Sequence, residues 1–129
     1  MTINDKLLDK VTEEAFASAR LRMNFNLHSS LDAKVQRLIN VLLPGTPIPI
    51  HRHRHTEETY IVLRGKLFVV FYDDLGRETE RYLLDPLNGD YGLQIPMGQW
   101  HTVEVFEPVA IFEVKEGPYN PLLPEDILY

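Results

Sequence analysis

The sequence predicts a mainly β protein, a sandwich or barrel of short strands preceded by one α-helix. Two observations lead to this fold class. Helical periodicity is confined to the first 19 residues of the 129-residue chain, and from Arg20 onward short alternating runs are separated by turn sequences. Such a series of short strands closes on itself, because an open sheet would leave its edges unpaired. We therefore expect a single domain, 1–129, made of a helix (1–19), a β-barrel (20–115) and a proline-rich tail (116–129).

The expected helix covers residues 4–19, where Leu7, Leu8, Val11 and Ala15 lie at helical spacing and Asn4 is a suitable N-cap. From residue 20 to 28 the period changes to two, which predicts a strand with one apolar and one polar face. That polar face either meets solvent, as one side of an antiparallel sheet commonly does, or lines a cavity. Its members are Arg20, Arg22, Asn24, Asn26 and His28.

Further strands follow at short intervals. A strand over 35–43 is terminated by Pro44-Gly45, and the others are expected at 48–53, 59–63, 67–72, 78–84, 92–95, 100–106 and 109–115. The tail carries three of the nine prolines, so it cannot be a central strand. We expect it to cross the surface or to reach a neighbouring subunit.

Composition excludes several classes of function. A net charge of -6 without a basic cluster argues against a nucleic-acid partner, and no apolar run is long enough to cross a bilayer. The first 20 residues lack the apolar core of a secretory signal, so a cytoplasmic location is expected. With no cysteine in the chain, only His, Asp and Glu remain as strong metal ligands.

The stretch IPIHRHRHTEETYIVLRG, residues 48–65, concentrates such ligands. In an extended chain His51 and His53 point to the same face, and Glu58 near the start of the next strand can lie opposite them. His101 follows a turn at 96–98 and shares its face with apolar residues, where a buried imidazole needs a partner. These four residues predict a site for one divalent transition metal: Fe, Mn, Ni, Co or Zn.

Two spaced motifs carry a resemblance to the cupin superfamily. The first runs from Gly45 through His51, His53 and Glu58 to Gly65, and the second comprises Pro96, Gly98 and His101. The resemblance implies a jelly-roll barrel (a double-stranded β-helix) in which His51, His53, Glu58 and His101 bind the metal. Cupins also commonly dimerise, so a homodimer is expected.

Within this superfamily the chain resembles the WbuC-type metalloproteins encoded among bacterial polysaccharide (O-antigen) genes. The similar segments include ARLRMNFNLHSS, VQRLINVLLPGTPIPIHRHRHTEETYIVLRG and EVKEGPY. The resemblance implies a sugar or sugar-nucleotide ligand in surface polysaccharide synthesis, and an isomerase or epimerase is the leading hypothesis. Two alternatives stay open: an iron-dependent oxygenase, and a non-catalytic protein that binds a saccharide through its metal.

Other polar residues are candidates for contact with the ligand. Arg22 and Asn24 are predicted to bind substrate, since guanidinium groups pair with carboxylate or phosphate. Tyr60 and His28 are the candidate catalytic residues; the alternative for Tyr60, which its pattern favours, is a core aromatic with its hydroxyl satisfied. His55 is expected to be solvated or to support the site, with an alternative role as a metal ligand or an acid/base, and Arg52 and Arg54 are expected to face solvent.

Overall fold

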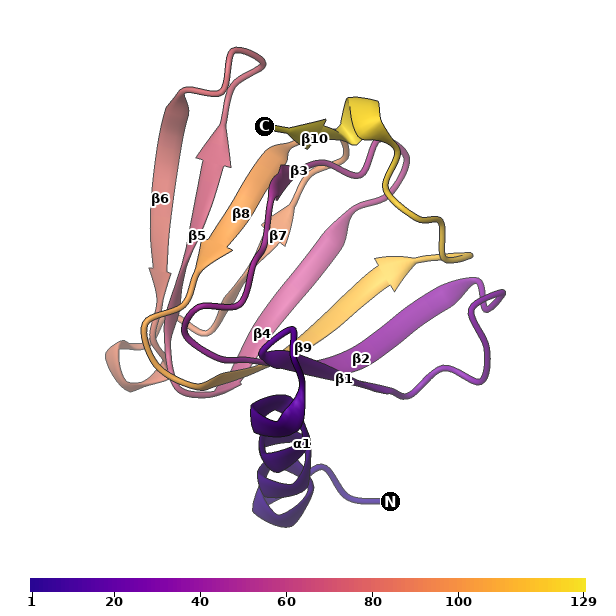
Figure 1. Ribbon diagram of the computed structural model, residues 1–129, viewed down its shortest axis with the longest axis vertical. Coiled ribbons are helices and arrows are strands. Elements are labelled where there is room, and N and C mark those ends of the chain that lie inside the picture. The colour runs from indigo at the N-terminus through magenta and orange to yellow at the C-terminus, as the bar shows by residue number, and fades with distance from the viewer.

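Two five-stranded antiparallel sheets face one another in the computed structural model, which describes residues 1–129 (Figure 1). The first sheet has the order β1 (Arg22–Asn26), β2 (Val35–Leu42), β9 (Val109–Glu116), β4 (Glu58–Arg64) and β7 (Gly92–Ile95). The second has the order β10 (Ile127–Leu128), β3 (Ile50–His51), β8 (Trp100–Glu104), β5 (Leu67–Tyr72) and β6 (Glu78–Leu84). Two short 3-10 helices, η1 (Pro86–Asn88) and η2 (Pro124–Asp126), lie in connections. The prediction of a mainly β jelly roll with an N-terminal helix is confirmed.

Helix α1 (Asp5–Ala17) covers the outer face of the first sheet (Figure 1). Asn4 caps it, because its side chain accepts a hydrogen bond of 3.0 Å from the backbone N–H of Leu7. Leu8, Val11 and Ala15 are buried in one apolar cluster with residues of β2. None of the helices combines the length and the apolar surface that a membrane span requires.

Strand β2 is apolar on both faces because each face meets a different layer. Ile39 and Val41 pack under the helix, whereas Leu42 belongs to the cluster between the two sheets. That inner cluster includes Val62, Val69 and other buried residues. The largely apolar character of 38–43 therefore follows from a strand buried on both sides.

Strands β1 and β3 are shorter than predicted, and the tail contains a short strand that was not expected. The first begins at Arg22 rather than Arg20, because Leu21 adopts a left-handed backbone with φ 55°. The strand expected at 48–53 is reduced to Ile50–His51, since Pro47 and Pro49 have no N–H to donate. The tail ends in β10, which pairs with β3 at the edge of the second sheet. An edge is where a segment with so many prolines can join a sheet.

Candidate metal centre

The ligand candidates come from both sheets. His51 of β3 pairs directly with His101 of β8, so two imidazoles leave adjacent strands of the second sheet. His53 follows in the loop after β3, where its carbonyl accepts a hydrogen bond of 2.7 Å from Gly98 N–H. Glu58 is the first residue of β4 in the opposite sheet. The packing of the two sheets therefore brings together side chains that are up to 50 positions apart in the sequence.

The four side chains converge on one point. One ligand atom from each of His51, His53, Glu58 and His101 lies within 4.8 Å of all the others. The His51 ring centroid is 4.3 Å from that of His101 and 5.2 Å from that of His53. Ligands at about 2.0 to 2.2 Å from an ion lie no more than about 4.4 Å apart, so the cluster needs only slight contraction to coordinate a metal.

Backbone carbonyls orient two of the imidazoles. The Nδ1 atom of His51 lies 2.9 Å from the carbonyl oxygen of Pro49, and that of His101 lies 2.9 Å from the carbonyl oxygen of Gln99. A carbonyl can only accept, so Nδ1 carries the proton in both rings and Nε2 keeps its lone pair. Both rings therefore present a metal-binding nitrogen to the cluster.

The electrostatics of the cluster favour the protonation states that a metal requires. Burial would raise the pKa of Glu58, but the adjacent His53 and His101 outweigh it and lower that pKa to about 2. Burial, with His101 as the next cause, lowers the pKa of His51 to about 4, and burial also lowers the pKa of His101. At neutral pH the site thus offers the Glu58 carboxylate and the neutral imidazoles of His51 and His101.

Two buried atoms of the cluster have no hydrogen-bond partner: Glu58 Oε1 and His101 Nε2. Glu58 Oε1 lies 2.7 Å from His53 Nε2 and 3.6 Å from His101 Nε2, within ion-pair distance but without hydrogen-bond geometry. An unsatisfied polar atom in the interior is costly, and a cation would satisfy both at once. The residues present thus fit a divalent metal bound by three imidazoles and one carboxylate.

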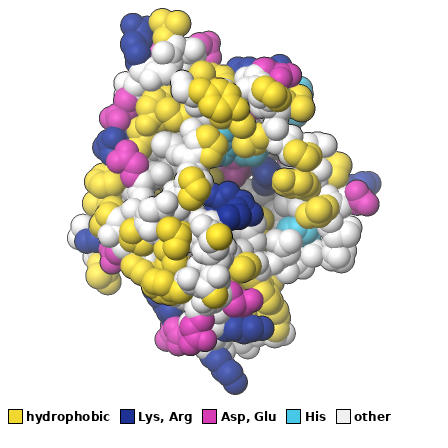
Figure 2. All heavy atoms as spheres, in the orientation of Figure 1, with side chains coloured by type: hydrophobic (Ala, Val, Ile, Leu, Met, Phe, Trp, Pro, Cys, Tyr) yellow, Lys and Arg dark blue, Asp and Glu magenta, His cyan; other side chains and the backbone are white.

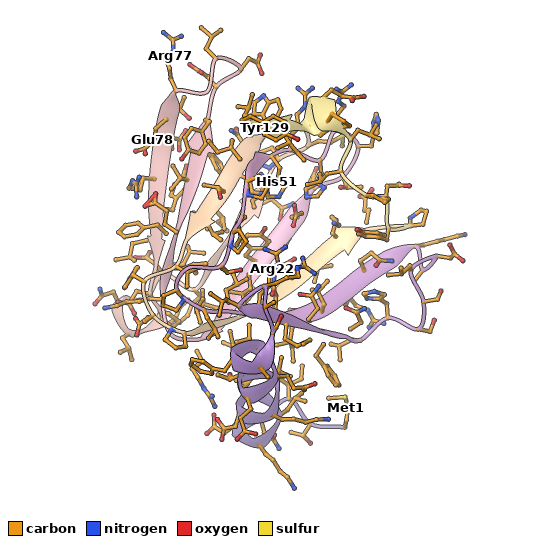
Figure 3. All side chains as sticks on the ribbon, viewed as in Figure 1. Met1, Arg22, His51, Arg77, Glu78 and Tyr129 are labelled. Carbon is orange, nitrogen blue, oxygen red and sulfur yellow. The ribbon has the colours of Figure 1, made fainter.

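A cavity of about 250 Å³ lies against this cluster. Predicted ligand-contacting residues Arg22, Asn24 and Tyr60 line it, together with His51, His53 and Glu58. Figure 2 shows a hollow near the centre of the face, with Lys or Arg side chains in front and His behind them. Figure 3 labels Arg22, on β1, and His51, on β3, which both belong to this lining. Part of the predicted polar face, Arg20, Arg22 and Asn24, therefore lines a cavity, whereas Asn26 is exposed.

Burial raises the pKa of Tyr60 well above its usual value, and the Glu58 and Glu113 carboxylates raise it further. The hydroxyl of Tyr60 is therefore protonated throughout the neutral range. Tyr60 also belongs to the apolar cluster between the sheets. It therefore lies in the core and lines the cavity at the same time.

Two other histidines singled out in the sequence, His28 and His55, lie outside this cavity. His28 is buried but is not among the residues that line the cavity, and its Nδ1 lies 3.0 Å from the backbone nitrogen of Arg37. The structure therefore does not bring His28 together with the metal cluster. His55 is exposed, because the strand ends at His51 and the alternation of the preceding residues does not continue.

Glu113 and Asn40 line the cavity but did not stand out in the sequence. Asn40 Nδ2 donates a hydrogen bond of 2.9 Å to Glu113 Oε1, while Asn40 Oδ1 is buried without a partner. Burial, then the nearby Glu58, raises the pKa of Glu113 to about 7. The available signal was strand parity, since Glu113 shares a face with the buried Ile111.

The C-terminal tail borders the site. It contributes Tyr119, Asn120 and Leu122 to the cavity, and beyond it lies a hollow of about 410 Å³ that shares residues with the cavity. Asp126 accepts hydrogen bonds from Arg52 Nε at 3.1 Å and Arg54 Nε at 2.6 Å. Arg54 is exposed and Arg52 half-buried, so both reach solvent as expected, but they also hold the tail to the loop that carries His53.

The two facing antiparallel sheets, with a His and Glu cluster between them, define a cupin fold. Solved structures agree with this class. CapF of Staphylococcus aureus, described as a capsular polysaccharide assembling protein, superposes with a TM-score of 0.66 at 19% identity over 81% of this chain and 30% of CapF. The protein TT1209 from Thermus thermophilus gives 0.63 at 22% identity over 90% of this chain and 97% of its own.

A sugar phosphate isomerase of the cupin superfamily from Silicibacter pomeroyi gives a TM-score of 0.57 at 20% identity, over 74% of this chain and 59% of that chain. At such identities these likenesses show the fold alone, and the chain spans less than a third of the length of CapF. No curated protein matches the sequence. The model of one family does match, over residues 3–84, so the chain belongs to the family described as a domain of unknown function, DUF6016.

Proposed function

We propose that this protein is a divalent-metal cupin that binds a sugar or sugar-nucleotide and transforms it, as an isomerase or epimerase in surface polysaccharide synthesis. The metal part of the proposal rests on the convergence of the side chains of His51, His53, Glu58 and His101. Two of their buried polar atoms have no hydrogen-bond partner. Three imidazoles and one carboxylate suit Fe, Mn, Ni, Co or Zn, and in octahedral coordination they leave two positions open for ligand oxygens.

The sugar part of the proposal has two supports. One is the resemblance to WbuC-type proteins over most of the chain, and the other is that structural neighbours include proteins described as a capsular polysaccharide assembling protein and a sugar phosphate isomerase. The cavity of about 250 Å³ is somewhat smaller than the roughly 300 Å³ of the smallest typical ligand pockets, so it suits the sugar unit of either ligand. We further propose that the protein is cytoplasmic and forms a homodimer. Sedimentation velocity measures the oligomeric state directly.

The residues around the cavity have distinct proposed roles. A metal in this site would polarise a carbonyl or stabilise an enediolate. Arg22 and Asn24, which line the cavity from β1, would bind and orient the ligand by hydrogen bonds. Tyr60, which also lines the cavity, is the candidate proton donor. His28 stays a prediction from the sequence, because its position away from the cavity gives it no role here.

Elemental analysis of freshly purified protein tests the metal site. We expect about one divalent ion per chain in the wild type and at least a tenfold loss in His53→Ala, because one ligand of four is removed. His55→Ala is the matched control, since His55 is two residues away and exposed. Equal metal content in His53→Ala and the wild type would contradict the ligand assignment.

The same metal-loaded protein separates the three functional hypotheses. Exchange of solvent deuterium into a sugar carbon supports an isomerase or epimerase. Oxygen uptake by the iron-loaded form indicates an oxygenase, and saccharide binding without either reaction indicates a binding protein.

A further inference from the structure

Arg20 and Arg22 both line the cavity without a carboxylate partner. They border the space that contains His51, His53 and Glu58, and neither takes part in any ion pair of the structure. The arginines that do form ion pairs, such as Arg64 and Arg81, have acidic partners within 3.1 Å. Two neighbouring guanidinium groups without an anion repel each other, and this arrangement costs free energy.

The position of Arg22 is fixed rather than free. Its Nη1 donates a hydrogen bond of 2.6 Å to the carbonyl oxygen of Pro47, which holds the guanidinium group at the cavity wall. Burial, followed by the charge of Arg20, lowers the pKa of Arg22, as expected for two cations held close together. Arg22 and His51, both labelled in Figure 3, line the same cavity from β1 and β3.

The rest of the cavity does not neutralise these charges. Three basic side chains, Arg20, Arg22 and Lys115, line it against two acidic ones, Glu58 and Glu113. Glu58 belongs to the metal cluster, and Glu113 is bound by Asn40. A divalent ion in the cluster would add further positive charge. A neutral sugar would leave this excess in place, whereas an anionic ligand would compensate it.

We propose that Arg20 and Arg22 form an anion subsite, which binds the phosphate or carboxylate of a monosaccharide-sized ligand whose hydroxyl or carbonyl oxygens reach the metal cluster. This inference rests on the proposed function for the metal contact, but the anion contact belongs to the two arginines alone. Guanidinium groups bind both kinds of oxyanion through paired hydrogen bonds, so the two ligand classes share one recognition chemistry.

Calorimetric titration with four probes tests the subsite: inorganic phosphate, glucose 1-phosphate, glucuronate and neutral methyl glucoside. We expect at least one of the two anionic sugars to bind the wild type about tenfold or more tightly than methyl glucoside, with affinity falling as salt is added. The phosphate and carboxylate probes then identify which oxyanion is preferred. Equal affinity for neutral and anionic sugars, or no saturable binding of any anion, would overturn the subsite.

Three variants assign the effect to residues. Arg22→Gln and Arg20→Gln should each weaken binding of the preferred anion about tenfold or more, while Arg37→Gln should leave it unchanged. Arg37 is a suitable control because it is exposed, forms no ion pair and lies outside the cavity lining. Undiminished anion binding in both Arg20→Gln and Arg22→Gln would also overturn the proposal, and circular dichroism verifies that each variant is folded.

Repeating the phosphate titration on chelator-treated protein separates the two proposals. Phosphate binding that depends on Arg22 in a protein that takes up no metal would support the subsite and contradict the proposed metal function. Stoichiometric metal binding without any anion binding would instead support the proposed metal site and contradict the anion subsite.

Discussion

Glu113 is a carboxyl group placed where ionisation is costly. Its pKa is raised from 4.5 to about 7, so the folded protein holds a proton that the unfolded chain releases at lower pH. The folded state is therefore destabilised as pH rises from about 4.5 to about 7, and the cost is fully present above that range. Glu113→Gln removes the ionisable group and keeps an oxygen to accept the hydrogen bond from Asn40.

We predict that Glu113→Gln raises the melting temperature of chelator-treated protein at pH 8 and has little effect at pH 5. Thermal unfolding followed by circular dichroism across this range measures the difference. A pH-independent difference between Glu113→Gln and the wild type would contradict the raised pKa, because a packing change alone does not follow the titration of a carboxyl group.

The metal ligands could be predicted from residue type and spacing in the sequence, but the other residues that line the cavity could not. His51, His53, Glu58 and His101 stand at motif spacing, and their residue types are metal ligands in their own right. Glu113 and Asn40 belong to common strand patterns, in which parity gives two faces but not which face is inward at the open end of the barrel. That choice depends on how the two sheets pack.

At the scale of elements, the tail and the loop after β3 are joined through Asp126. The carboxylate of Asp126 is shared by Arg52 and Arg54, which flank the ligand candidate His53, and the backbone N–H of Arg52 also donates to the Asp126 carbonyl at 3.0 Å. The Arg52 guanidinium lies 4.4 Å from the ring centroid of Trp100, which fixes it further. Loss of the carboxylate would leave two close guanidinium groups unpaired.

We predict that Asp126→Ala lowers the free energy of unfolding by about 1 to 3 kcal/mol and makes metal dissociate faster, because the loop carrying His53 loses its anchor. Limited proteolysis should cut the tail of this variant sooner, and transfer of metal to a chromogenic chelator gives the dissociation rate. Glu125→Ala is the control, since the Glu125 side chain forms no ion pair. Identical behaviour of the two variants would show that the tail does not hold the loop.

Strand periodicity predicted the elements better than their ends. Sequence patterns identified the stretches that became β1, β2 and β4 to β9, although β6 is exposed along nearly its whole length. The predicted strand extended beyond His51, because alternation continues through Arg52 and Arg54 while the pairing with β8 stops at His51. Their pairing with Asp126, more than 70 residues away, depends on tertiary structure that local sequence does not encode.

At the scale of the whole molecule, the candidate metal centre joins the two sheets. His51 and His101 belong to the second sheet and Glu58 to the first, and backbone hydrogen bonds do not link β4 directly to β3 or β8. Without an ion, Glu58 Oε1 and His101 Nε2 lie buried between the sheets without hydrogen-bond partners. Metal would thus stabilise the packing of the sheets as well as supply chemistry, since the unfolded chain does not present the four ligands together.

We predict that manganese or zinc raises the melting temperature of chelator-treated protein, and that free metal at about 100 times its Kd adds about 2.7 kcal/mol to the free energy of unfolding. Glu58→Gln should abolish most of this response, because the neutral amide is a much weaker ligand of similar size. His55→Ala should respond as the wild type does. Differential scanning calorimetry with and without metal measures all three proteins. A metal response in Glu58→Gln as large as in the wild type would mean that the ion does not bind between the two sheets at this cluster.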